Sequence, residues 1–123
     1  MVMRQLIILI FLLSSQNIFS KRTSETFKVE FHDKETKIIS PKKFIKKLSV
    51  IVTNKSLSKI IFKVLKETGK SLGFYILNPK QFQSVDLEFT SKNEEFYLIP
   101  YAPPSQKIIL KIGQDAYEIP SNR

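Results

Sequence analysis

Short runs that alternate apolar and polar side chains constrain the fold of this 123-residue chain more than any other feature. Phe27, Val29 and Phe31 alternate with Lys28 and Glu30. A period of two in aromatic and β-branched residues is typical of a strand with one buried face. Similar short runs follow at residues 48–53, 73–77, 84–89, 95–98, 108–112 and 117–119. The pattern therefore predicts an all-β chain.

Turn residues and prolines bound these runs. Residues 32–37 (HDKETK) are predicted to be a turn, and 38–39 a short edge element because Pro41 follows closely. Pro100 is expected to end its strand, and 101–106 (YAPPSQ) to be a rigid loop because proline fixes φ and cannot donate a hydrogen bond. About 7–8 strands spaced roughly 8–12 residues apart are typical of a small, mostly antiparallel Greek-key β-sandwich or a small barrel.

Residues 57–68 fit two patterns. The apolar positions that would form one face of an amphipathic helix are Leu57, Ile60, Ile61, Val64 and Leu65. The strand interpretation instead places Ile60, Phe62 and Val64 on one face, with a hairpin turn at 67–70. We favour the strand because the neighbouring elements all alternate with period two.

The first twenty residues have the order of a secretory signal peptide. Arg4 precedes an unbroken apolar run at 6–13, and Ser20 ends a short polar stretch. The run is far shorter than the roughly 20 residues of a membrane-spanning helix. Ile18 matches the cleavage pattern poorly, so a retained leader is the alternative. We expect a signal peptide at 1–20, a flexible arm at 21–26, and one domain at 27–120 that acts in the periplasm or outside the cell.

The composition of the mature chain excludes several chemistries. Cysteine is absent, both methionines precede residue 6, and His32 is the only histidine. Soft-metal sites need thiolates, thioethers or several imidazoles, so one chain cannot build such a site. Asp86, Glu88, Glu94 and Glu95 offer oxygen ligands for a hard cation, but solvated or lysine-paired carboxylates are favoured. We predict a protein that is not an enzyme and has no cofactor.

Two segments resemble a cupredoxin-like domain: SPKKFIKKLSVIVTNKSLSKIIFKV at 40–64 and SVDLEFTSKNEEFYLIPYAPPSQKIILKI at 84–112. The resemblance is carried by Pro41, Phe44, Val52, Thr53, Asn54, Lys55, Phe62, Phe89, Glu95, Phe96 and Tyr97. It implies a β-sandwich, and an immunoglobulin-like sandwich is equally compatible with these positions.

The copper ligands that the resemblance would imply are missing. The family's first histidine would fall near Ile60 or Ile61, and its cysteine at Leu98. The loop 101–107, where a second histidine and a methionine are expected, contains neither. The resemblance therefore implies the scaffold without its metal, and function has to be argued from the surface of the protein.

A dense run of lysines is the first candidate surface. Ten lysines and one acid lie between Lys34 and Lys66, and the mature chain carries a net charge of +8 once Arg4 is removed. The densest part consists of Lys42, Lys43, Lys46 and Lys47. Such a cluster either faces an anionic envelope surface or an acidic protein, or keeps edge strands soluble. Nucleic acid is not expected as a partner, because the cluster lacks the interleaved aromatic residues of single-strand binders.

An aromatic and proline-rich segment is the second candidate surface. Tyr97, Tyr101, Pro103 and Pro104 either present a partner-binding loop or close one end of the core. His32 is interpreted as a solvated turn residue. Asn54 begins an Asn-Lys-Ser glycosylation signal that matters only in a eukaryotic source.

The sequence thus predicts an exported, non-enzymatic binding or accessory module that lacks copper. Two alternatives stay open. One is a periplasmic metal-handling accessory that acts with partner proteins. The other is a secreted inhibitor or effector that uses the loop 101–106.

Overall fold

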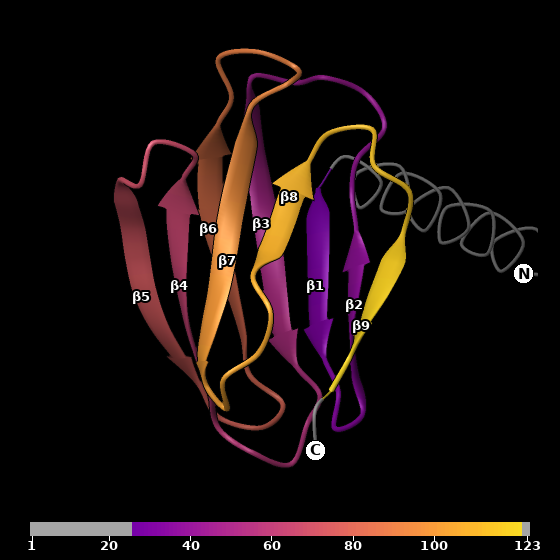
Figure 1. The fold of residues 1–123 in the computed structure, drawn as a ribbon, viewed down its shortest axis with the longest axis vertical. Coiled ribbons are helices and arrows are strands. Elements are labelled where there is room, and N and C mark those ends of the chain that lie inside the picture. The colour runs from indigo at the N-terminus through magenta and orange to yellow at the C-terminus, as the bar shows by residue number, and fades with distance from the viewer. Residues whose placement is uncertain (1–25, 122–123) are drawn as a thin grey trace, which may run out of the picture.

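The computed structural model describes residues 26–121, which form nine β-strands and no helix (Figure 1). The strands are β1 (Phe27–Phe31), β2 (Glu35–Ile39), β3 (Lys47–Asn54), β4 (Ile60–Lys66), β5 (Ser71–Leu77), β6 (Phe82–Glu88), β7 (Glu95–Ala102), β8 (Ile108–Lys111) and β9 (Tyr117–Pro120). The all-β prediction is confirmed, with nine strands in place of the expected 7–8. The helical alternative for residues 57–68 is wrong, because β4 occupies most of that segment.

The strands form two sheets between which the chain passes repeatedly. The five-stranded sheet has the order β6-β3-β1-β2-β9, and the four-stranded sheet the order β5-β4-β7-β8. In Figure 1 the four-stranded sheet lies in front. Six of the seven pairings are antiparallel, but β1 and β3 run parallel. The sheets are therefore mostly antiparallel, with one parallel pair.

One hydrophobic core joins the two sheets. Alternate side chains of β1, β3, β4 and β7 are buried, as a period of two requires. The ring of Phe31 in the five-stranded sheet lies 6.3 Å from that of Phe62 in the four-stranded sheet. Phe89 stacks on Phe27 and meets the edge of Phe96 at 4.7 Å. Each such buried ring contributes about 1.5–3 kcal/mol relative to an exposed one.

The segment before Pro41 differs from its prediction. β2 begins at Glu35, so the turn is shorter than 32–37, and the backbone N–H of His32 donates to the carbonyl of Glu35. β2 is also not an edge strand, because it pairs with β1 on one side and β9 on the other. Pro41 allows this position because it lies beyond the end of β2.

Pro100 does not end its strand. β7 continues to Ala102, and Pro100 lies opposite Phe62 of β4. The register shifts between Ile61 and Phe62, and such an irregularity accommodates a residue that lacks a backbone donor. The predicted loop 101–106 is therefore wrong at its first two residues, and the connection to β8 starts at Pro103, after a cis peptide bond.

In the stretch 26–121, no helix has the length and apolar character needed to cross a bilayer. The predicted signal peptide and all but the last residue of the predicted arm lie outside the described residues.

Candidate binding surfaces

The four lysines of the first candidate surface lie close together in the chain, and two of them form ion pairs with acidic side chains. Lys42, Lys43 and Lys46 lie between β2 and β3, Lys47 begins β3, and all four are exposed. Lys42 donates to Asp115 at 2.9 Å, which lowers the pKa of that carboxyl below its usual value. Lys46 lies 3.8 Å from Glu88. Within residues 26–121, Lys43 and Lys47 form no ion pair.

The tyrosines and prolines of the second candidate surface lie at two separate places in the structure. Tyr97 and Tyr101 lie on the face of β7 that points away from the core, whereas Pro103 and Pro104 line a cavity of about 600 Å³. Phe31, His32, Ile60 and Pro100 also line this cavity, which opens where the β1–β2 turn approaches the β7–β8 connection. At this cavity Pro103 is half-buried and Pro104 is exposed.

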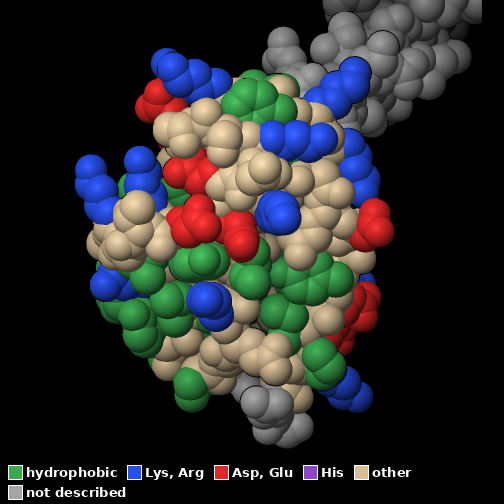
Figure 2. Space-filling view, turned by 45° about the horizontal axis from the view of Figure 1, so that its top comes forward, with side chains coloured by type: hydrophobic (Ala, Val, Ile, Leu, Met, Phe, Trp, Pro, Cys, Tyr) green, Lys and Arg blue, Asp and Glu red, His purple; other side chains and the backbone are tan. Residues whose placement is uncertain are grey.

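The two tyrosines belong to an apolar surface, here called the outer face of the four-stranded sheet. Its other large side chains are Ile61 of β4 and Phe74 and Ile76 of β5, placed next to one another by the strand register. Phe74, Ile76 and Tyr101 are 59%, 55% and 47% exposed. The rings of Phe74 and Tyr101 lie 6.2 Å apart. In Figure 2, hydrophobic side chains gather over the lower part of the view.

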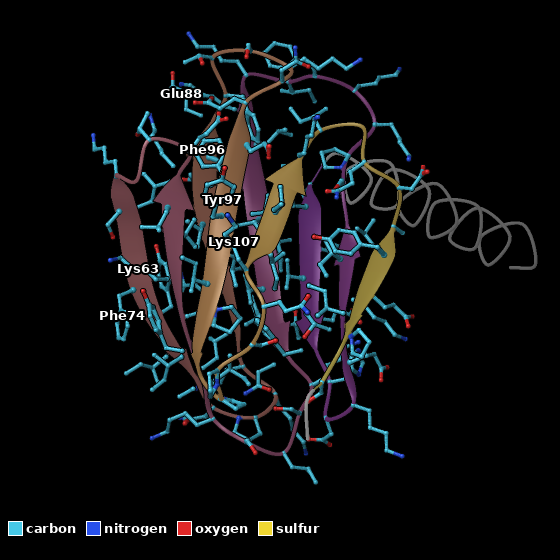
Figure 3. The ribbon with its side chains drawn as sticks, viewed as in Figure 1. Lys63, Phe74, Glu88, Phe96, Tyr97 and Lys107 are labelled. Carbon is cyan, nitrogen blue, oxygen red and sulfur yellow. The ribbon has the colours of Figure 1, made fainter. Side chains whose placement is uncertain are left out.

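Two lysines lie on this outer face. Lys107 places its ammonium 4.1 Å from the centre of the Tyr97 ring, and Lys63 lies opposite Phe74 in the strand register (Figure 3). Burial raises the pKa of Tyr97, and the carboxylates of Glu95 and Glu67 raise it further. Tyr97 is half-buried, whereas Tyr101 and Phe74 are open to solvent.

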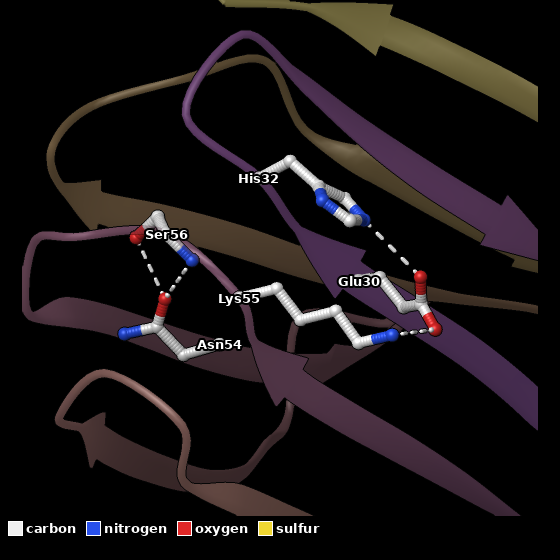
Figure 4. A network of polar contacts seen from close by, with 5 residues as sticks. All are labelled: Glu30, His32, Asn54, Lys55 and Ser56. Carbon is white, nitrogen blue, oxygen red and sulfur yellow. Dashed lines mark hydrogen bonds and ion pairs between the residues drawn. The ribbon is translucent and has the colours of Figure 1, made fainter.

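His32 takes part in a charged cluster instead of being a solvated turn residue. Its Nε2 lies 3.1 Å from one carboxylate oxygen of Glu30, and Lys55 lies 3.2 Å from the other (Figure 4). Burial raises the pKa of Glu30, but the contacts with His32 and Lys55 outweigh it and leave the pKa below its usual value. Asp33 accepts a hydrogen bond from the backbone of Leu57. Within residues 26–121, no group of three or more His, Cys, Asp or Glu side chains could hold a metal ion.

Three of the four predicted carboxylates contact separate partners within the protein. Asp86 accepts a hydrogen bond from Ser49, Glu88 pairs with Lys46, and Glu94 accepts hydrogen bonds from Thr90. Glu88 is therefore paired with a lysine, whereas Asp86 and Glu94 accept hydrogen bonds instead.

Asn54 is fully buried and is not a surface acceptor for a glycan. Its amide nitrogen donates to the carbonyls of Ser58 and Leu77, and its oxygen accepts from the N–H and hydroxyl of Ser56 (Figure 4). These bonds hold the β3–β4 loop, so the side chain has a structural role.

Two of the positions that would carry copper ligands hold core residues. Leu98 and Ile60 are buried among the hydrophobic side chains that both sheets share. Sequence reasoning missed Phe74 and Ile76 as surface residues. The run 73–77 was predicted as a strand, and the structure shows that Phe74 and Ile76 lie on its face that points away from the core. Comparisons with protein-family models, curated proteins and solved structures gave no match.

Proposed function

We propose that this protein is an exported, non-enzymatic binding module that uses the outer face of its four-stranded sheet to hold a partner. The observation that carries the proposal is the solvent exposure of Phe74, Ile76 and Tyr101 next to one another. Contiguous exposed apolar patches on soluble proteins usually mark sites of interaction.

The apolar character of this face is not needed for folding. The core lies between the two sheets and is formed by the faces that they turn toward each other. Phe62, Phe96 and Leu98 of the four-stranded sheet are fully buried there. Side chains on the outer face could all be polar, as they commonly are in antiparallel sheets with one solvated face. An aromatic pair retained on the solvent side is therefore better explained by binding than by stability.

We further propose a β-sandwich of the cupredoxin-like or immunoglobulin-like kind with Greek-key connections. The support is the passage of the chain from β3 to β4 and from β6 to β7, which crosses between the sheets each time. The proposed absence of catalysis rests on the composition: His32, the only histidine, lies in a cluster with Glu30 and Lys55.

Export is tested with a reporter enzyme that folds only outside the cytoplasm, fused to the end of the full chain. We expect activity from the full chain and none after residues 1–20 are deleted. Equal activity from both fusions would show that the leader does not direct export.

Binding is tested by placing a photo-crosslinking phenylalanine at Tyr101 or, as a control, at Phe82. Phe82 is 68% exposed on the five-stranded sheet. In irradiated cells we expect a discrete adduct from position 101, its loss when Phe74→Ser is added, and none from position 82. Adducts of equal yield from both positions, or from neither, would contradict the proposed face.

A further inference from the structure

β5 differs from the other three strands at sheet edges. β6 contains Asp86 and Glu88, β8 is four residues long and ends in Lys111, and β9 contains Glu118 and Pro120. Charges, prolines and short length are the usual means by which edge strands avoid pairing with other chains. β5 (SLGFYIL) is seven residues long and has no charged residue and no proline.

The backbone of β5 is paired on one side only. Among the described residues its ladder runs to β4, and no pairing with β6 is formed. In an antiparallel ladder, alternate residues direct their N–H and C=O groups to the other side. β5 therefore presents a row of hydrogen-bonding groups beside the exposed side chains of Phe74 and Ile76.

Positive charge lies at both ends of this strand. Lys70 immediately precedes β5, Lys80 follows it after the turn, and Lys63 lies beside Phe74 on β4. None of the three forms an ion pair with a described residue. The free edge is thus an apolar strand with a lysine beyond each end, and Lys70 also lines a groove that contains Asp86 and Glu88.

We propose that β5 binds an extended segment of a partner protein, which adds to the four-stranded sheet as a fifth strand. Main-chain hydrogen bonds would supply affinity, and alternate side chains specificity. The segment would present apolar residues beside Phe74 and Ile76, and acidic residues at its two ends to meet Lys70 and Lys80. The inference rests on the proposed function and names the partner's chemistry.

A second copy of this chain fits the edge less well than an acidic segment. Antiparallel pairing of two β5 strands would bring the Lys70 end of one copy beside the Lys80 end of the other. Parallel pairing would place each lysine beside its own counterpart. Either arrangement brings like charges together, whereas opposite charges across an interface favour association.

The test uses the protein obtained by expressing the full chain. Synthetic peptides are titrated into it, and binding is followed by NMR through the backbone amide resonances of the protein. The probe has a core of alternating Thr and Val as long as β5, with Glu at both ends. We expect saturable shifts in β5 and slowed hydrogen exchange of its outward N–H groups. A peptide with Lys at its ends should bind about threefold to tenfold more weakly.

Two controls separate strand addition from simple contact with the outer face. N-methylation of alternate peptide residues keeps the side chains and removes the donors, so it should abolish binding. Phe74→Lys should weaken binding at least about tenfold by placing a charge on the edge, whereas Phe82→Lys should leave it unchanged.

Three outcomes overturn the inference. Equal binding of the N-methylated peptide would leave the proposed binding face intact but exclude strand addition. A dimer in sedimentation that Phe74→Lys dissociates would identify a second copy as the occupant. Binding to phosphatidylglycerol vesicles that Phe74→Lys abolishes, with no peptide binding, would identify a membrane surface.

Discussion

Asn54 stabilises the β3–β4 loop with bonds that no apolar residue can replace. Asn54→Ala would leave the buried carbonyl of Leu77 and the hydroxyl of Ser56 without this partner. We expect a loss of roughly 2–3 kcal/mol in the free energy of unfolding, measured by urea denaturation. Asn93→Ala, in an exposed turn, is the control and should change stability by less than about 0.5 kcal/mol. Equal effects would contradict the assigned role.

Glu30 should make stability depend on acid pH. Its pKa is lowered in the folded protein from the ordinary value of 4.5, so the carboxylate stabilises the fold above that value. The contribution is lost as the pH falls through the folded-state pKa, because the unfolded chain then binds the proton more readily. In urea denaturation, Glu30→Gln should lower stability at pH 7 and have a smaller effect at pH 3. A loss of the same size at both pH values would contradict the ionic role.

At the scale of strands, Phe62 is the ring that links the sheets. It is fully buried, 5.3 Å from Tyr75 of β5 and 6.3 Å from Phe31 of β1. Phe62→Ala should lower the free energy of unfolding by about 3–5 kcal/mol, because it leaves a cavity between the layers. The matched control is Phe82→Ala, which removes an exposed ring of the same size. A similar loss from both variants in thermal unfolding would contradict this packing.

The sequence predicts strands well where apolar and polar residues alternate strongly. It predicts them poorly where the strand conformation depends on pairing with neighbouring strands. β1, β3 and β7 alternate clearly, so their cores were predictable from the chain alone. β2 contains Glu35 and Lys37 and looks like a turn; its strand conformation depends on β1 and β9 pairing on either side. Pro100 is tolerated because β4 shifts register near it, which no local pattern encodes.

The candidate surfaces were predictable only as separate residues. Tyr97 and Tyr101 were identified from the sequence, but Phe74, the neighbour of Tyr101, comes from a strand that the β4–β5 hairpin brings alongside β4. Pro103 and Pro104 follow closely in the chain yet line a cavity instead of this face. Which side chains share a face depends on strand order, so this part of the site needed the structure.

At the scale of the whole molecule, the net charge predicts weak, salt-sensitive attraction to anionic surfaces. Because Lys42 and Lys46 are paired with acids, Lys43 and Lys47 should contribute more. In co-sedimentation with phosphatidylglycerol vesicles at low ionic strength, Lys43→Ser with Lys47→Ser should reduce binding more than Lys42→Ser with Lys46→Ser. Raising the salt should weaken binding in every variant. No binding by the unmutated protein, or the reverse order of the two variants, would contradict this prediction.

The exchange of strands between the sheets has a consequence for the timing of folding. β3 pairs with β6, β4 with β7, and β2 with β9, so six of the nine strands have a neighbour that is distant in the chain. Non-local pairings of this kind slow folding, because the intervening chain loses conformational entropy before the stabilising contacts form. Neither sheet can close until the last third of the chain is available. For a polypeptide that we propose is exported, this delay keeps the early strands unfolded, and able to pass through a narrow channel, until most of the chain has been made.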